Sequence, residues 1–291
     1  MWPKVIAIVL NWNGKDNTFE CLKSLKSVEY PNYEIIVVDN ASTDGSQKFL
    51  REKFPDITII ENKRNLGFGG GFNVGIREAI KRNADYVLCL SNDVVLDKKI
   101  LTELVKIGEL SDSIGVLCAM EYAYDEPDRI ICAGGTIGKI GLVGGRMFGY
   151  GEKDIGQFNE VRETGMLSGP AMMLKVNALL DIGFFDTSYF YGPEDKDMAL
   201  RLMKKRYKII FVPTAKFWHK RRGSVGGKFT PLSVFFEVRN SLLYVRKNLM
   251  NLNKFEQFLS FLYLGLIDFP IILFKCFLSS KKIRTLYECC N

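Results

Sequence analysis

The stretch "EIIVVDNASTDGSQKFLREKFPDITII", residues 34–60, decides the fold class of this chain. An apolar, β-branched run at residues 34–39 is followed by helical spacing at 44–54 and by a second apolar run at 57–60. Two short apolar runs that flank one helical segment are typical of parallel strands joined by a crossover helix. The stretch therefore predicts an α/β protein with a parallel sheet and helices on both faces.

The alternation extends on both sides of that stretch. We expect strands at residues 5–10, 86–90 and 115–120, and helices at residues 17–28, 70–82 and 97–110. The sequence after residue 120 alternates less regularly. There we expect a glycine-rich loop or hairpin at 133–151, a strand at 165–175, a helix at 195–205, a strand at 208–212 and a helix from Pro231 to about Leu249.

The composition is that of a globular protein, with 291 residues of which 47% are hydrophobic and 25% charged. The seven cysteines form no C-x-x-C pair, which favours reduced thiols in a cytosolic protein over a disulfide framework or a structural zinc site. The first apolar run, residues 5–10, is short for a signal peptide, so we expect a buried strand there.

The basic excess is concentrated near the C-terminus. From Lys220 onward there are 12 Lys and Arg against 4 Asp and Glu, whereas the first 219 residues have 28 against 29. Such an excess indicates either a solvated face or a surface that is attracted to an anionic partner. We expect no nucleic-acid partner.

Residues 258–278 are apolar over about the length of a membrane span, but Asp268 and Pro270 interrupt them. We expect peripheral membrane contact; a span, a re-entrant segment, or packing on the catalytic domain or on another subunit are the alternatives.

Polar residues follow three of the predicted strands directly, at residues 11–13, 39–44 and 91–93. Ligands of open α/β sheets bind beyond the carboxyl ends of the strands, so these residues are expected to line one crevice. Asp39 could accept hydrogen bonds from a base or a ribose there. Turn formation by Asp, Asn, Ser and Gly is the alternative explanation for residues 39–46.

Residues 62–76, "NKRNLGFGGGFNVGI", place five glycines before and inside a predicted helix. Glycines let backbone amides approach a phosphate, and a helix N-terminus favours an anion. A dinucleotide-binding fingerprint would need glycine where Phe72 or Val74 stands, and it would follow the first strand. A dinucleotide-dependent oxidoreductase is therefore disfavoured.

Three further side chains are candidates for chemistry. Asp93, with Ser91 and Asn92 beside it, offers the hard oxygen ligands that suit Mg²⁺ or Mn²⁺, although a plain strand-to-helix turn is also possible. Asp195 stands at the start of the predicted helix 195–205, where the helix dipole would keep it ionised as a general base. His219 is the only histidine and is either structural or a metal ligand.

Taken in order, the motifs resemble those of a family 2 glycosyltransferase of the GT-A fold. They are N-W-N, V-D-N-A-S-x-D-G-S, N-x-G-F-G-G-G-x-N-x-G, N-D-V, S-G-x-x-M, E-D-x-D and W-H, and they span residues 5–219. The resemblance is closest to the rhamnosyltransferase and galactofuranosyltransferase branches. It implies a Rossmann-like mixed sheet flanked by helices in a catalytic domain at 1–230. A helical, basic and apolar, membrane-proximal extension follows at 231–291.

The resemblance also implies roles for matching residues. Asp195 would be the catalytic base with Glu194 beside it, and Asp93 and His219 would bind a divalent metal, Mg²⁺ or Mn²⁺. Gly169 and Asp197 would lie on the acceptor side. The donor-binding residues would be Asn11, Asn13, Asp39, Asn40, Asn65, Gly67, Gly70, Asn73 and Asn92. Ser91 departs from the family pattern because it replaces the first carboxylate of the metal-binding triplet.

The implied activity is inverting transfer from a UDP- or dTDP-sugar to a hydroxyl of a glycan or lipid-linked acceptor, in cell-surface polysaccharide or glycan assembly. The implied location is the cytoplasmic face of a membrane. A polyprenyl-phosphate sugar synthase, a sugar nucleotidyltransferase and a non-catalytic binding module are the alternatives. "LNWNGKDN" after the first strand is a poor match to the glycine- and basic-rich signature of a nucleotidyltransferase.

Overall fold

A computed structural model of the chain describes residues 1–137, 145–221, 231–249 and 254–263. Packing divides the chain into two units. The first contains Met1–Thr136, Met147–Phe190 and Glu194–Arg222, and the second contains the remaining residues, including the two C-terminal helices. Every candidate site residue named above belongs to the first unit.

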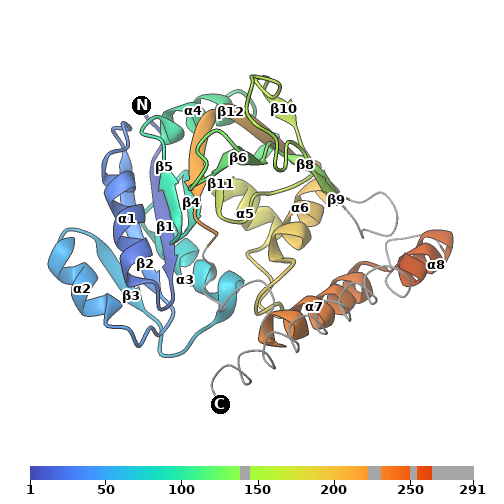
Figure 1. Ribbon diagram of the computed structural model, residues 1–291, viewed down its shortest axis with the longest axis horizontal. Helices are drawn as coiled ribbons and strands as arrows, with labels where there is room; N and C mark the ends of the chain where they lie inside the picture. The colour runs from blue at the N-terminus through green and yellow to red at the C-terminus, as the bar shows by residue number, and fades with distance from the viewer. Residues whose placement is uncertain (138–144, 222–230, 250–253, 264–291) are drawn as a thin grey trace, which may run out of the picture. The chain divides into compact units, whose positions relative to one another are not determined.

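The first unit is built on a ten-stranded mixed sheet (Figure 1). Four strands pair in parallel, in the spatial order β3 (Thr58–Glu61), β2 (Tyr33–Asp39), β1 (Val5–Asn11) and β4 (Tyr86–Ser91). β11 (Ala171–Lys175) then lies antiparallel to both β4 and β6 (Ile114–Ala123). The predicted parallel sheet is therefore correct for the first four strands, and β11 makes the whole sheet mixed.

The far side of the sheet is formed by β12 (Lys208–His219), which is parallel to β6. The remaining strands attach at this side: β5 (Val94–Leu96) to β12, β7 (Ile130–Cys132) to β6, and β10 (Arg162–Glu163) to β12. β12 is longer than the predicted strand 208–212. It continues through a register shift after Val212, so His219 lies within the strand and does not follow it.

Helices cover both faces of the sheet, as predicted. α1 (Lys15–Lys26), α2 (Ser46–Lys53) and α4 (Ile100–Gly108) bury Leu22, Leu50 and Leu101 in one core with Val5, Ala7 and Val9. Side chains alternate along a strand, so the neighbouring Ile8 points to the other face. There α3 (Gly67–Lys81) packs against it. α5 (Val176–Ile182), which the sequence did not predict, and α6 (Glu194–Lys204) complete this unit.

Within the glycine-rich segment 133–151, the described residues form a small two-stranded sheet from β8 (Gly135–Ile137) and β9 (Gly145–Met147). This pairing agrees with the predicted hairpin, but residues 138–144, which connect the two strands, lie outside the described residues. The predicted strand 165–175 is shorter than expected, because only Ala171–Lys175 pair in the sheet.

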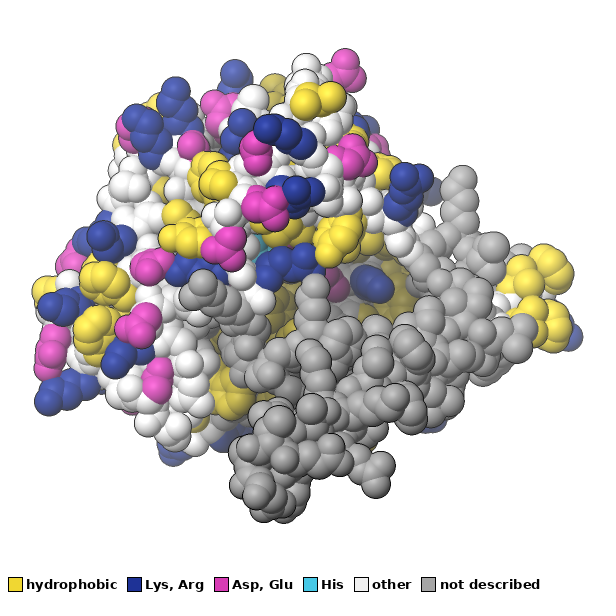
Figure 2. Space-filling view, in the orientation of Figure 1, with side chains coloured by type: hydrophobic (Ala, Val, Ile, Leu, Met, Phe, Trp, Pro, Cys, Tyr) yellow, Lys and Arg dark blue, Asp and Glu magenta, His cyan; other side chains and the backbone are white. Residues whose placement is uncertain are grey.

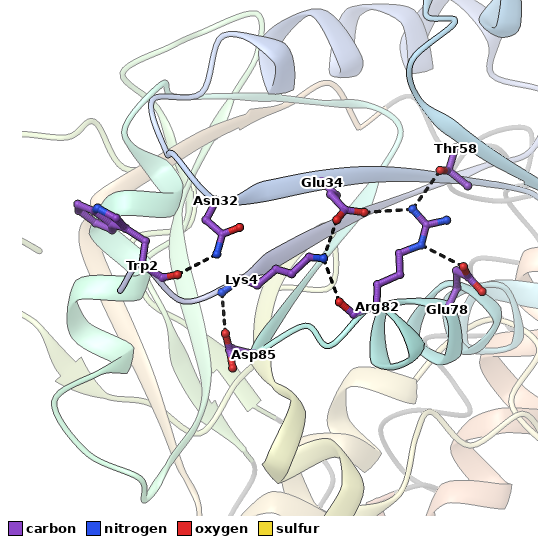
Figure 3. Close-up of polar contacts among 8 residues, drawn as sticks. All are labelled: Trp2, Lys4, Asn32, Glu34, Thr58, Glu78, Arg82 and Asp85. Atoms are coloured by element: carbon purple, nitrogen blue, oxygen red, sulfur yellow. Dashed lines mark hydrogen bonds and ion pairs between the residues drawn. The ribbon is translucent and has the colours of Figure 1, made fainter.

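The amino-terminal edge of the parallel strands carries a network of charged side chains (Figure 3). Lys4, just before β1, bonds Glu34 of β2 at 2.6 Å, and Glu34 also bonds Arg82 at 3.1 Å. Arg82 follows α3 and reaches Glu78 at 3.0 Å and Thr58 of β3 at 3.2 Å. The network ties the ends of α3, β1, β2 and β3 together on the edge opposite the candidate site.

In the second unit, α7 (Pro231–Leu249) begins at Pro231 as predicted and is followed by α8 (Lys254–Tyr263). Asn240 of α7 donates a hydrogen bond to the carbonyl of Tyr191 at 2.5 Å. In the part of the chain that the structure describes, no helix has the length and apolar character needed to cross a membrane. Most of the apolar stretch 258–278 lies outside the described residues.

Charged side chains of both signs are interspersed over the described surface on the face shown in Figure 2. This agrees with the near balance of acidic and basic residues in the first 219 residues.

Candidate active site

Three polar side chains meet at the carboxyl ends of β1, β2 and β4. Asn11 Nδ2 donates to Asp39 Oδ2 at 2.7 Å, and Asn92 Nδ2 donates to Asn11 Oδ1 at 3.1 Å. All three residues are buried, because the strand ends that carry them are direct neighbours in the sheet. The prediction that these strand ends converge on one place is confirmed.

The loop after β2 is organised around the carboxylate of Asp39. Its Oδ1 accepts hydrogen bonds from Ser42 N at 2.9 Å and from Gln47 Nε2 at 2.8 Å. With Asn11, these bonds occupy three of the roughly four acceptor positions of a carboxylate. Asp39 therefore organises the turn, and these three bonds leave one acceptor position of its carboxylate beyond them.

Asn13 and Ala41 have positive φ angles of 50° and 64° in the two loops that face each other here. Asn13 N donates to Ser42 Oγ at 2.9 Å, and Thr43 N donates to Asn13 Oδ1 at 2.7 Å. Left-handed backbone at a non-glycine residue such as Ala41 costs free energy and concentrates at functional sites. These cross-loop bonds hold the strained conformation in place.

Asn40, Asn65 and Gly67 build the start of α3. Asn40 Nδ2 donates to the Gly67 carbonyl at 2.9 Å, and Gly67 N donates to Asn65 Oδ1 at 2.8 Å. Gly67 has a φ of 75°, and a Cβ there would lie 2.2 Å from the carbonyl oxygen of Phe190. The glycine is thus required for the close approach of the segment that leads to α6.

Asn73 fixes the same segment from inside α3. Its Nδ2 donates to the Phe185 carbonyl at 2.8 Å and its Oδ1 accepts from Phe185 N at 3.0 Å. Gly70 packs tightly against Leu66, whose Cβ would lie 2.9 Å from an added Cβ. In this structure both residues therefore make contacts within the chain itself.

Asp93 and His219 meet because β5 pairs with β12, with His219 opposite Val94. His219 Nε2 lies 3.3 Å from Asp93 Oδ2, and its Nδ1 lies 2.7 Å from Glu121 Oε1. Burial alone would lower the pKa of His219, but the hydrogen bonds and charges of Asp93 and Glu121 outweigh it and raise the pKa to about 9. In the absence of other ligands this is an imidazolium held between two carboxylates.

Sequence reasoning missed Glu121. It is buried at 4% exposure, and its Oε2 accepts a hydrogen bond from Ser168 Oγ at 2.8 Å. The signal was present, since Glu121 directly follows the predicted strand 115–120. The rule that picked out Asn11, Asp39 and Ser91 at strand ends would have picked out this residue too.

Asp195 lies in the first turn of α6 and is half-buried. Burial raises its pKa, against the smaller opposing effects of Lys196 and two backbone hydrogen bonds. The helix start was expected to favour ionisation, but loss of solvent acts in the other direction. A Cβ on Gly169 would lie 3.5 Å from Asp195 Oδ2. Gly169 follows Ser168, whose hydroxyl bonds Glu121, so one short segment contacts both the candidate base and Glu121.

The two other carboxylates of the E-D-x-D motif point elsewhere. Asp197 Oδ2 accepts from Arg201 Nε at 2.8 Å, one helical turn away. Glu194 is buried, with its Cγ 3.6 Å from the Cβ that a residue at Gly69 would have. Of the three, Asp195 is the carboxylate that the structure leaves half-exposed.

Within the described ranges, no group of three or more His, Cys, Asp or Glu side chains could hold a metal ion. Asp93 and His219 together supply two ligands, one oxygen and one nitrogen. Glu121 stands behind His219 as a carboxylate usually stands behind a metal-bound histidine. The donor set therefore fits a cation that takes its other ligands from a bound diphosphate or from water.

A family model described as glycosyl transferase family 2 matches residues 6–183 of the chain. The chain belongs to this family. A second model, described as glycosyl transferase family group 2, matches residues 145–230. Together the two matches cover the parallel strands, β11, α6 and His219.

Among curated relatives, this family 2 chain is 25% identical over 218 residues to the poly-beta-1,6-N-acetyl-D-glucosamine synthase of Staphylococcus epidermidis. The match covers 74% of this chain and 50% of that protein, so the chain spans half the length of that relative. The relatives found do not show the rhamnosyltransferase or galactofuranosyltransferase branch to which the motifs were compared.

Two solved structures resemble this family 2 chain in fold. The mannosyltransferase PcManGT of Pyrobaculum calidifontis, in complex with GDP-Man and Mn²⁺, has a TM-score of 0.62 at 19% identity and is matched over 98% of this chain and 76% of its own. GalNAc-T7 with UDP, GalNAc and Mn²⁺ has a TM-score of 0.64 at 13% identity, over 93% and 57%. The predicted GT-A fold, a mixed sheet flanked by helices, is confirmed.

Proposed function

We propose that this chain transfers a glycosyl group from a nucleotide-diphosphate sugar to a hydroxyl of an acceptor, during assembly of a cell-surface polysaccharide or glycan. The observation that carries the proposal is the run of buried polar contacts at the carboxyl edge of the sheet. It leads from Asp39 through Asn11 and Asn92, and Asn92 adjoins Asp93, which contacts His219. The family match and the poly-N-acetylglucosamine synthase relative support the same activity.

The donor would bind along this edge. The remaining acceptor position of Asp39 suits the N–H of a nucleobase or the hydroxyl of a ribose. Asn13 and the start of α3 would line the nucleoside and diphosphate. A UDP- or dTDP-sugar is the proposed donor class, and the two solved relatives hold GDP-Man and UDP.

Asp93 and His219 would hold Mg²⁺ or Mn²⁺ together with the diphosphate of the donor. Such a cation offsets the negative charge that develops on the departing nucleotide diphosphate. Both solved relatives contain Mn²⁺. With Ser91 in place of a further carboxylate, the protein supplies little negative charge, so the cation is expected to bind tightly only with the nucleotide present.

Asp195 would take the proton from the acceptor hydroxyl as that oxygen attacks the anomeric carbon, which inverts the configuration at that carbon. A carboxylate whose pKa is raised by burial is, in its ionised form, a better proton acceptor than an exposed one. The small residue Gly169 beside it leaves room for an acceptor at this carboxylate. The mechanism needs no covalent intermediate.

We further propose that the chain works at the cytoplasmic face of a membrane, held there by peripheral contacts of its C-terminal region. The concentration of basic residues after Lys220 supports this. The acceptor would then be a glycan or a lipid-linked sugar presented at the membrane surface.

A donor screen tests the proposal. The purified full chain, with Mn²⁺, is incubated with UDP-, dTDP- and GDP-sugars, with and without extracted glycolipid acceptors, and released nucleoside diphosphate is measured. We expect release from one donor class that increases when acceptor is added. If the chain neither binds nor cleaves any of these donors, the proposed function is wrong.

A further inference from the structure

Glu121 is a buried carboxylate at the site to which the motifs gave no role. It lies on β6 opposite Phe217 of the parallel strand β12, and His219 is two residues further along β12. Residues two apart on a strand share one face, so Glu121 and His219 project to the same side of the sheet. This placement brings Glu121 Oε1 to 2.7 Å from His219 Nδ1.

The imidazole of His219 stands between two carboxylates at unequal distances. Glu121 is at hydrogen-bonding distance from Nδ1, whereas Asp93 Oδ2 is 3.3 Å from Nε2. A neutral imidazole has one N–H, and its proton stays on the nitrogen that makes the stronger hydrogen bond. The shorter contact therefore favours the proton on Nδ1 and leaves the lone pair of Nε2 directed to the side of Asp93.

Glu121 is itself held in a fixed orientation. Ser168 Oγ donates to its second oxygen, Oε2, at 2.8 Å. The side chains of Glu121 and His219 are only 6% and 14% exposed, so water does not compete strongly for either contact. A carboxylate fixed at both oxygens can determine which nitrogen of its histidine partner carries the proton.

We propose that Glu121 is a positioning residue that keeps His219 in the Nδ1-protonated tautomer, so that Nε2 is free to bind a divalent cation next to Asp93. The inference rests on the proposed function, because it concerns the cation that would accompany the donor diphosphate. It adds a residue, Glu121, and a requirement, the correct tautomer, that the sequence motifs do not contain.

The only histidine of the chain makes the tautomer directly observable. A long-range ¹H–¹⁵N spectrum of the full chain with ¹⁵N-labelled histidine contains one imidazole. We expect a proton on Nδ1 and none on Nε2 with saturating Mg²⁺ and UDP, and the same tautomer in the neutral ring without ligand, at a pH above the pKa of about 9. In Glu121→Leu without ligand, the proton is expected to move to Nε2, because Asp93 is then the remaining acceptor. An unchanged tautomer in this variant overturns the inference.

Metal affinity gives a second readout. The binding of Mn²⁺ in the presence of UDP, measured by calorimetry, is expected to weaken about 10- to 100-fold in Glu121→Leu. Glu121→Gln keeps an oxygen acceptor for Nδ1 and is expected to lose clearly less affinity than Glu121→Leu. Tyr122→Phe is the matched control, since it removes the neighbouring Tyr122–Asp154 bond of 2.5 Å without touching His219. Equal Mn²⁺ affinity in Glu121→Leu, Glu121→Gln and the parent chain overturns the inference.

The two readouts separate this inference from the proposed function. The metal-free spectrum needs neither donor nor turnover, so a chain that cleaves no sugar nucleotide can still show the tautomer change. Conversely, a chain that transfers sugar but keeps its tautomer in Glu121→Leu retains the proposed function and refutes the role of Glu121.

Discussion

His219 and Asp195 lie in the same site, but their surroundings affect their ionisation differently. Burial disfavours the charged form of each side chain. In His219 the carboxylates of Asp93 and Glu121 reverse that effect and raise the pKa to about 9. In Asp195 burial prevails over Lys196 and the backbone, so its pKa is raised. One side chain thus holds a proton tightly, and the other accepts one more readily than an exposed aspartate does.

The raised pKa of His219 makes stability depend on pH. The imidazolium stabilises the fold fully below its ordinary pKa of 6.5, and this contribution is lost as the pH rises through the folded pKa of about 9. The difference between the two pKa values corresponds to about 3 kcal/mol. Urea unfolding of the full chain with a chelator, between these two pH values, should show a decline that is much smaller in His219→Gln. The same decline in both chains would contradict the ion pairs.

The candidate site residues that could be predicted from the sequence lie at the ends of apolar strands. Asn11, Asp39 and Asn92 were found because the carboxyl ends of parallel strands share an edge, and this needs no knowledge of packing. The contacts of Asn73 could not be predicted, because its partner is the backbone of Phe185, 112 residues away. Its position in the glycine-rich motif suggested phosphate binding, whereas its observed contacts are with the chain itself.

At the level of elements, the packing of α3 on β1 depends on glycines whose spacing the sequence analysis linked to phosphate. A Cβ on Gly75 would lie 2.6 Å from Ile8 Cγ2, and one on Gly71 would lie 2.4 Å from Leu10 Cδ1. A side chain at either position would meet contacts this short, and α3 or the side chains of β1 would have to move. The inner glycines therefore set the distance between α3 and the strands, which in turn places the loop at Asn65 and Gly67.

A pair of glycine substitutions separates packing from catalysis. Gly75→Ala is expected to lower the free energy of unfolding by about 1–3 kcal/mol through overpacking. Gly169→Ala adds its Cβ at an ordinary contact distance of 3.5 Å from Asp195 Oδ2, so stability should change little. Its turnover should nevertheless fall, because the methyl group occupies space beside the carboxylate. Chemical denaturation and the donor assay measure the two effects; a destabilised Gly169→Ala with full turnover would contradict this assignment.

Helices and strands could be predicted where a single local sequence pattern was enough to assign them. Apolar β-branched runs and helical spacing predicted β1 to β4 and α1 to α4 to within a few residues. The prediction of β12 ended too early because Pro213 and Thr214 end the apolar run. Its pairing with β5 and β6 shows that the strand continues, through a register shift between Val212 and Lys216. The short strands β5, β7 and β10 are defined by pairing with distant segments, so no local pattern marks them.

At the scale of the whole molecule, charged residues fall into three groups that lie in different parts of the chain. The network of Lys4, Glu34 and Arg82 binds the amino edge of the sheet, while the buried carboxylates Asp39, Asp93 and Glu121 occupy the carboxyl edge. The unbalanced basic residues lie after Lys220. In the sequence, the basic excess therefore follows the residues that carry the candidate site.

The membrane proposal predicts binding that depends on charge. Full-length chain should co-sediment with vesicles of anionic phospholipid at low salt, stay soluble with neutral phosphatidylcholine vesicles, and be released by high salt. Replacing Lys281 and Lys282 with Glu should weaken sedimentation. The same replacement at Lys48 and Lys53 of α2 is the matched control and should have little effect. A full chain that stays in the supernatant with anionic vesicles at low salt would refute the proposal.

Asp195 is proposed to remove the acceptor proton at a site that would hold a sugar nucleotide. The most direct test compares Asp195→Asn with the parent chain in two measurements on one preparation, UDP binding with Mn²⁺ and donor turnover with acceptor. Turnover should fall about 100- to 10,000-fold while UDP binding stays within a few-fold. Asp181→Asn, which disturbs the exposed 2.9 Å contact with Lys205, is the control and should keep the turnover of the parent chain. Turnover of Asp195→Asn within about ten-fold of the parent would contradict the assignment of Asp195 as the base.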